Sequence, residues 1–199
     1  MKYGIPNERT EKGFDLIKFL YGPLIKKPNK YFDDKKIDVL DVGTGSGYLL
    51  RLLRKKKPNW NLKGIDPSEA LSLNKEKGIE LISGYAEELP FKDKSFDLVL
   101  SKSSLCYWND VDKSLREIKR VLKDDGKFYM MDVNRSKWFK ILLIIFGKII
   151  LGKSKKDMSN FSDRAYSIKE VKVIMERVGL KYNIRRLFGG AYFLVWGSK

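Results

Sequence analysis

The sequence predicts a single α/β domain, 1–199, in which a seven-stranded, mostly parallel sheet has helices on both faces and ends in an antiparallel hairpin. Three observations lead to this prediction. From residue 37 onward, short apolar stretches alternate with amphipathic stretches of helical length, which is typical of βαβ units. The last two apolar stretches flank Gly189 and Gly190, which favours a hairpin. Hydrophobic residues make up 43% of the 199 residues, which is enough to build a core.

Each predicted element has its own signal. Leu49, Leu50 and Leu53 recur at helical spacing after a glycine cluster. Ser167 and Glu170 form a capping box at the start of the last helix. The predicted strands are 37–40, 61–66, 79–84, 96–101, 126–133, 180–188 and 191–196, and the predicted helices are 48–57, 67–78, 111–123 and 167–179.

The composition excludes several kinds of site. The chain has no histidine and one cysteine, Cys106, so it contains no histidine base, no internal disulfide and no His- or Cys-rich metal centre. We therefore predict no metal, and we interpret Cys106 as a packing residue. The net charge of +16 attracts nucleic acid, anionic membranes or acidic small molecules without choosing among them. The polar first residues lack an apolar signal region, which favours a cytoplasmic protein.

A glycine cluster carries the clearest functional signal. Gly43, Gly45 and Gly47 directly follow a predicted strand and directly precede a helix, where backbone N–H groups can approach a ligand closely. Asp66 lies at the tip of the next strand, where a carboxylate accepts hydrogen bonds from ribose hydroxyls. Together they predict a cofactor containing adenosine. The glycines alternate and follow an acid, Asp41, unlike the spacing of a dinucleotide site.

These motifs resemble those of the class I S-adenosylmethionine-dependent methyltransferases, in particular the type-11 group that includes the ubiquinone and menaquinone biosynthesis C-methyltransferases. The resemblance covers about residues 37–133 and rests on VLDVGTGSG, GIDPS, GYAEELPF, FDLVLSKSSLCYWND and VLKDDGKFYMMD. It implies a Rossmann-like class I methyltransferase fold. It also implies S-adenosyl-L-methionine as the cofactor and S-adenosyl-L-homocysteine as its product.

The resemblance further implies a role for each matching position. The residues implied for the methionine end of the cofactor are Asp41, Gly43, Gly45 and Gly47. The residues implied for the ribose and adenine are Asp66, Pro67, Tyr85, Ala86 and Glu87. The residues implied below the sulfonium are Ser101 and Lys102.

Two departures from the family pattern bear on the chemistry. Tyr85 stands where family members usually carry an aspartate, and the stretch 105–108 lacks the histidine that many members have there. The catalytic residue is therefore unknown. Tyr107, Asp110 and Asp132 are candidates for a base, but the structural interpretations are favoured: a pocket wall, a helix cap and a hydrogen-bonded carboxylate at a strand end.

Two segments fall outside the alternating pattern. Residues 1–36 are predicted to form an N-terminal helical cap over the cofactor, with FDLIKFLYGPLI (14–25) as its helix and Tyr21 as a contact. Residues 134–166 are predicted as a lid-like insertion before the last helix. Within the insertion, 138–151 is apolar with cationic flanks, and it is shorter than the roughly 20 residues that cross a bilayer. A lid or a membrane-surface segment and a helix packed into the core are both open interpretations.

The sequence thus predicts an S-adenosylmethionine-dependent methyltransferase that acts on a small hydrophobic or amphiphilic acceptor. Peripheral contact with an anionic membrane is a further expectation, and nucleic acid is left open as a partner. The alternatives are an RNA or protein methyltransferase and a non-enzymatic protein that binds S-adenosylmethionine at a membrane surface.

Overall fold

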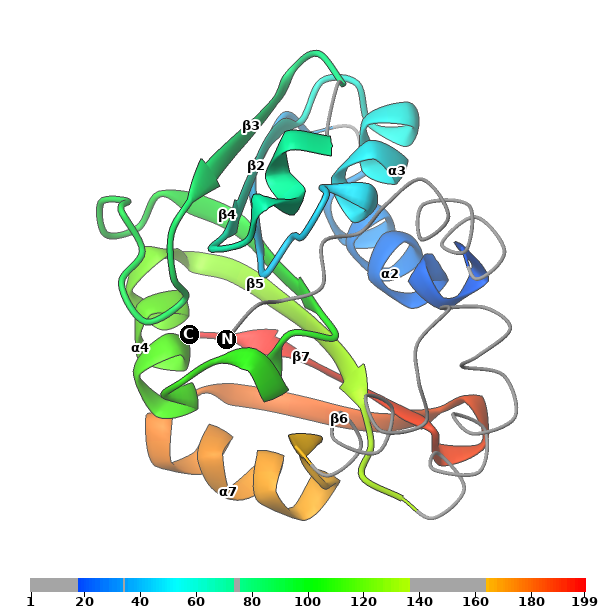
Figure 1. Cartoon of the computed structure of the whole chain (residues 1–199), viewed down its shortest axis with the longest axis vertical. Coiled ribbons are helices and arrows are strands. Elements are labelled where there is room, and N and C mark those ends of the chain that lie inside the picture. Colours follow the sequence, from blue (N-terminus) through cyan, green and yellow to red (C-terminus); the bar gives the residue numbers. More distant parts are fainter. Residues whose placement is uncertain (1–17, 34, 74–75, 137–163) are drawn as a thin grey trace.

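The computed structural model describes residues 18–33, 35–73, 76–136 and 164–199, and its centre is a seven-stranded sheet (Figure 1). The strand order is β3-β2-β1-β4-β5-β7-β6, and β7 runs antiparallel to both of its neighbours while the other pairs are parallel. The strands are β1 (Asp38–Val42), β2 (Asn61–Asp66), β3 (Ile79–Ser83), β4 (Phe96–Lys102), β5 (Leu122–Val133), β6 (Lys181–Leu187) and β7 (Tyr192–Ser198). The predicted sheet and its final hairpin are confirmed.

Helices cover both faces of the sheet, because strand residues alternate between two cores. Leu98 and Leu100 of β4 pack with the helices α2 and α3, whereas Val99 packs on the opposite face with α4 and α7 (Figure 1). The α-helices are α2 (Gly22–Phe32), α3 (Tyr48–Lys56), α4 (Val111–Val121) and α7 (Ile168–Val178). Short 3-10 helices are η1 (Lys18–Tyr21), η2 (Glu69–Leu73), η3 (Leu105–Tyr107) and η4 (Phe188–Gly190).

The topology places a ligand site at one edge of the sheet. The strand order reverses direction between β1 and β4, and the carboxyl ends of parallel strands meet at the same edge. The crevice outside a reversal of this kind is where open α/β sheets bind ligands. The glycine cluster follows β1 at this point, and the segment that begins with Ser103 follows β4.

Three predicted elements differ from the observed ones. The segment 67–78, expected to be a helix, contains only η2 among its described residues, because Asp66 Oδ1 accepts a hydrogen bond from the Ser68 N–H and forms a turn instead. The strand β5 begins at Leu122, four residues before its predicted start, because Leu122 already pairs with Phe96. The α-helix near the N-terminus begins at Gly22, with Pro23 in its first turn, and continues to Phe32.

Other local predictions are confirmed. Ser167 and Glu170 form the reciprocal capping box at the start of α7, and Gly179 ends this helix in a left-handed conformation. Most of the proposed lid, 137–163, and the first part of the proposed cap, 1–17, lie outside the described residues.

Candidate functional site

The glycine loop between β1 and α3 is held in a conformation that glycine adopts readily. Gly43, Gly45 and Gly47 have φ angles of 76°, 55° and 75°. The N–H of Gly43 donates to the Ile65 carbonyl at 2.9 Å, which ties the loop to β2. A Cβ atom added to Gly43 would lie 2.4 Å from the Cβ of Ser104, whereas one added to Gly45 would meet no atom of the described residues within 4 Å. The backbone at Gly45 therefore faces open space that a ligand could fill.

Asp41 is a buried carboxyl group at the base of this loop, with 2% of its surface exposed. Its Oδ2 accepts a hydrogen bond of 2.7 Å from the Thr44 hydroxyl. Within the described part of the chain, its Oδ1 is buried and has no hydrogen-bond partner. Burial raises the pKa of Asp41 to about 7, and the nearby negative charge of Asp66 acts in the same direction. Such a group is complementary to a cationic hydrogen-bond donor.

Asp66 links the end of β2 to the glycine loop. Its Oδ2 accepts from the Gly45 N–H at 2.8 Å, and its Oδ1 accepts from the Ser68 N–H at 2.9 Å. Pro67 lies between Asp66 and Ser68 in the chain. Each carboxylate oxygen has a further lone pair, so the group can still accept hydrogen bonds from ligand hydroxyls.

The predicted adenine segment follows β3 beside the end of β2, since the Gly84 N–H donates to the Asp66 carbonyl at 3.3 Å. Tyr85 has 56% of its surface exposed, while Ala86 is buried in the core. Glu87 Oε1 accepts from the backbone N–H groups of Asn109 and Asp110, at 2.5 and 3.1 Å. The Glu87 carboxylate therefore anchors this segment to the chain in front of α4.

A cluster of polar and aromatic side chains lies at the ends of β4, β5 and β7. Ser101 is buried, and its hydroxyl lies 2.5 Å from the Ser104 hydroxyl. The Lys102 ammonium lies 4.3 Å from the ring centre of Tyr21 and 5.8 Å from that of Tyr192. Tyr192 could not be placed here from local patterns, because its contact with Lys102 depends on the antiparallel register of β7.

The structural interpretations of two base candidates are supported. Asp110 caps α4, since its Oδ1 accepts from the Lys113 N–H at 2.9 Å. Asp132 is buried, and its carboxylate accepts from the backbone N–H groups of Leu105 and Val133 at 2.9 and 2.7 Å. Burial nevertheless raises the pKa of Asp132 to about 6.

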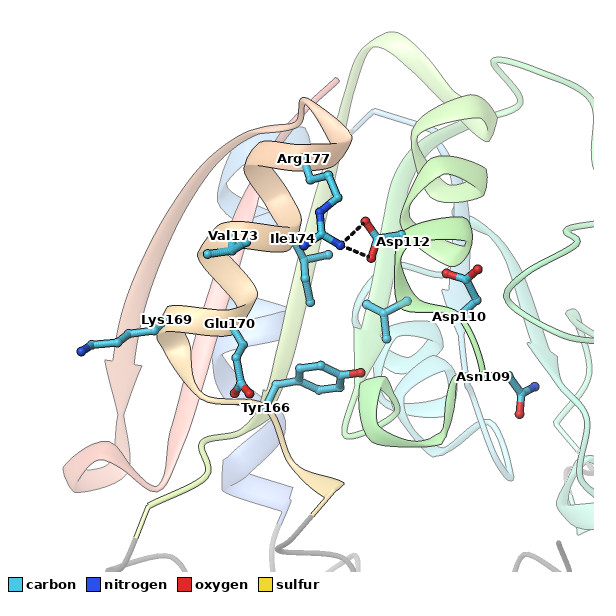
Figure 2. Close-up of a pocket in the computed structure, with 10 residues that line it drawn as sticks. Asn109, Asp110, Asp112, Tyr166, Lys169, Glu170, Val173, Ile174 and Arg177 are labelled. Atoms are coloured by element: carbon cyan, nitrogen blue, oxygen red, sulfur yellow. Dashed lines mark hydrogen bonds and ion pairs between the residues drawn. The ribbon is translucent and has the colours of Figure 1, made fainter.

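A separate hollow of about 570 Å³ lies between the beginning of α4 and the length of α7 (Figure 2). Arg177 pairs with Asp112 across it, at 3.1 and 3.2 Å. Tyr166 points into the hollow from the segment before α7 (Figure 2). None of the residues assigned to the glycine loop or to the end of β2 lines this hollow, so it is distinct from the candidate cofactor site.

Comparisons with known proteins agree with this architecture. A family model described as a methyltransferase domain matches residues 40–130. A demethylmenaquinone methyltransferase of Staphylococcus aureus (strain JH9) is 30% identical over 186 residues, which cover 83% of this chain and 77% of that protein. The uncharacterized methyltransferase YdaC of Bacillus subtilis is 37% identical over 94 residues, 45% of this chain and 52% of that protein. The chain spans about half the length of several curated relatives that it matches.

Among solved structures, the plantazolicin methyltransferase BpumL, in complex with a monoazolic desmethylPZN analog and SAH, superimposes with a TM-score of 0.79. It is 16% identical, and the match covers 96% of this chain and 88% of that one, so it supports the fold alone. The chain belongs to the class I S-adenosylmethionine-dependent methyltransferases of the type-11 group. The predicted family and the Rossmann-like fold are therefore confirmed.

Proposed function

We propose that this protein transfers the methyl group of S-adenosyl-L-methionine to a small hydrophobic or amphiphilic acceptor. Two observations on the described residues together carry the proposal: Asp41 has a buried oxygen with no hydrogen-bond partner among them, and none of them fills the space beside Gly45. A cofactor with an ammonium group fits the first, and a ligand that lies close to backbone fits the second. S-adenosylmethionine supplies a methyl group that is already activated by a positively charged sulfur.

In this proposal the chain's own residues bind and orient. Asp41 accepts a hydrogen bond from the ammonium of the methionine end, and Asp66 accepts from the ribose hydroxyls. The segment after β3, Tyr85 to Glu87, frames the adenine, with Pro67 on the side of β2. Because the methyl donor is activated, alignment of the reactants supplies most of the required rate enhancement. A base is needed only when the acceptor is a weak nucleophile.

The acceptor class rests on two supports. A relative that this chain covers over most of its length is a demethylmenaquinone methyltransferase, whose name indicates an aromatic quinone-like acceptor with apolar character. The surroundings of Lys102 include the rings of Tyr21 and Tyr192, which suit a flat, partly apolar molecule. The charge of +16 is the observation that favours the alternative, an RNA or protein acceptor.

Labelled S-adenosylmethionine tests the acceptor class directly. The protein is incubated with the cofactor, labelled in its methyl group, and with a cell extract separated into apolar-lipid, small-polar, RNA and protein fractions. We expect the label in the apolar-lipid fraction. Label in RNA or protein would instead support the alternative, and binding of the cofactor without transfer to any fraction would support a non-enzymatic role. Heat-denatured protein is the control.

We also propose a cytoplasmic protein that contacts anionic membranes peripherally. Phe19 and Phe188 have 62% and 40% of their surfaces exposed, and their rings lie 5.8 Å apart in an edge-to-face contact. Lys18 directly precedes Phe19 in the chain, and cations of this kind contribute about 1 kcal/mol each near an anionic surface. Among the described residues, no helix is long and apolar enough to cross a membrane.

Vesicle flotation tests this contact. We expect the protein to float with vesicles containing anionic lipid at low salt, and Phe19→Ser to bind several-fold less. The matched control is Val173→Ser, because Val173 is a 53% exposed apolar residue on α7, in the layer on the other face of the sheet. Equal binding by Phe19→Ser and the wild type would contradict a role of this aromatic pair. Binding to neutral vesicles that is independent of salt would contradict the electrostatic contribution.

A further inference from the structure

Lys102 has an ammonium group whose hydrogen-bonding capacity is largely unused. It has three N–H donors, and the structure gives it one hydrogen bond among the described residues, a long contact of 3.4 Å to the Ser103 hydroxyl. Its other neighbours are the rings of Tyr21 and Tyr192. The residue is partly buried and is the last residue of β4. A charged group of this kind is complementary to an anionic oxygen on a ligand.

The carboxyl groups and tyrosine rings around Lys102 come from four elements. Asp132 of β5 and Asp41 of β1 attract the charged form of the amine, but loss of hydration outweighs them and lowers the pKa of Lys102 to about 8. Tyr192 of β7 is neutral near physiological pH, because burial raises its pKa to about 12. Tyr21 of η1 contributes the face of its ring. The amine can thus exist in both protonation states near neutral pH.

The position of Lys102 is fixed by the backbone. Lys102 pairs with Met131 in the parallel register of β4 and β5, and the next residue, Ser103, donates its N–H to the Met131 carbonyl at 2.9 Å. Ser103 has a φ angle of 55°, so the chain turns sharply directly after Lys102. The amine is therefore carried on a strand end beside the glycine loop, which is a rigid support for a reactive group.

We propose that Lys102 is a catalytic residue that accepts the proton of an aromatic or enolic hydroxyl group on the acceptor and then binds the resulting oxygen anion. This inference rests on the proposed function and adds the chemistry of the acceptor. The O–H bond breaks, its proton forms the third N–H bond of the ammonium, and the electron pair stays on the acceptor. That pair, on oxygen or on the conjugated ring carbon, receives the methyl group. The ammonium afterwards returns its proton to water.

Other groups are less suited to this role. The chain has no histidine. The carboxylate of Asp132 is occupied by two backbone N–H groups, and that of Asp110 caps α4. Tyr192 holds its proton too tightly to act as a base near neutral pH. Lys102 combines a neutral form that is accessible near pH 8 with unused donors for the product anion.

The kinetic test uses hydroxynaphthalenes of graded acidity as acceptors. We expect Lys102→Met to lower the methylation rate of unsubstituted 2-naphthol about 10²- to 10⁴-fold, the usual effect of removing a general base. A nitro-substituted naphthol that is already ionised at the assay pH should lose far less. Lys102→Arg keeps the cation but does not act as a base, so it should retain activity only on the ionised acceptor. The control is Lys172→Met, on the exposed side of α7.

A binding measurement provides a second readout that does not depend on turnover. With S-adenosylhomocysteine present, the wild type should bind the nitro-substituted naphthol as its coloured anion at a pH below the pKa of the free compound. Lys102→Met should remove this spectral shift and leave the affinity for S-adenosylhomocysteine unchanged.

Several outcomes would overturn the assignment. They are an equal rate loss on both acceptors, no loss on either, or a parallel loss of S-adenosylhomocysteine affinity, which would assign Lys102 to the cofactor. If the wild type methylates no hydroxynaphthalene, the acceptor class is wrong. The spectral shift then decides the role of Lys102 separately, and its absence in the wild type would reject that role.

Discussion

Asp41→Asn is expected to weaken S-adenosylmethionine binding roughly ten- to hundredfold while making the ligand-free protein more stable. The affinity falls because the variant loses a charged acceptor for the ammonium of the cofactor, an interaction worth about 1.5–3 kcal/mol. The stability rises because the buried carboxylate of Asp41 lacks a partner for Oδ1 in the described structure. Asparagine carries no charge, so its burial costs less, and its carbonyl oxygen can still accept from Thr44.

The sign of the pH dependence follows from the direction of the pKa shift. In the folded protein the pKa of Asp41 is raised from 3.8 to about 7, so folding disfavours the charged form. The free energy of unfolding should therefore fall as pH rises from about 4 to about 7, by at most on the order of 4 kcal/mol from this group. Asp41→Asn should lack this decrease. Urea unfolding of both proteins between pH 4 and 8 measures it.

Cofactor binding should show the opposite trend. The ammonium of S-adenosylmethionine favours the charged carboxylate, so the wild-type affinity should increase up to about pH 7, and the variant affinity should not follow this increase. Asp66→Asn is the contrasting variant, because Asp66 is only partly buried and accepts from two backbone N–H groups. It should lose affinity without a gain in stability. Calorimetric titration that gives equal affinities for Asp41→Asn and the wild type would remove Asp41 from the site.

The sequence was sufficient for the parts of the molecule that depend on local patterns. Alternating apolar stretches predict the strands, and the glycines at 43, 45 and 47 predict the turn that the structure contains between β1 and α3. The capping box of Ser167 and Glu170 is equally local. These features are readable because each depends on residues within a few positions of one another.

The surroundings of Lys102 could not be predicted in the same way. Tyr21, Lys102 and Tyr192 meet because η1 packs beside the ends of β4 and β7. Nothing in the local sequence fixes that packing or the order of the strands in the sheet. In the segment 67–78 a local pattern was present but predicted the wrong structure. The helical pattern was overridden by the turn that Asp66 forms with Ser68. The surroundings of Lys102 and the conformation of 67–78 therefore depend on long-range strand register and on side-chain hydrogen bonds, which local sequence patterns do not reveal.

Two substitutions in the glycine loop are expected to have different effects. Gly45→Ala should mainly weaken cofactor binding, whereas Gly43→Ala should mainly lower the stability of the fold. Both glycines have positive φ angles, so an alanine at either position costs about 1–2 kcal/mol of backbone strain. At Gly45 the added methyl group meets no atom within 4 Å, so the fold should tolerate it. The same methyl group would occupy the open space assigned to the cofactor. Gly45→Ala should thus melt only a few degrees below the wild type and bind S-adenosylhomocysteine at least tenfold more weakly.

Gly43→Ala should instead lose stability. Its methyl group would lie 2.4 Å from the Cβ of Ser104 and 2.9 Å from the Ser104 hydroxyl, so the strand end that carries Ser101 and Lys102 would have to move. Overpacking of this kind adds about 1–3 kcal/mol to the backbone strain, which should lower the melting temperature by roughly 10 °C. Thermal unfolding beside calorimetric titration distinguishes the two variants. Equal melting temperatures would contradict the clash with Ser104. Wild-type binding by Gly45→Ala would show that the cofactor does not lie in the open space beside Gly45.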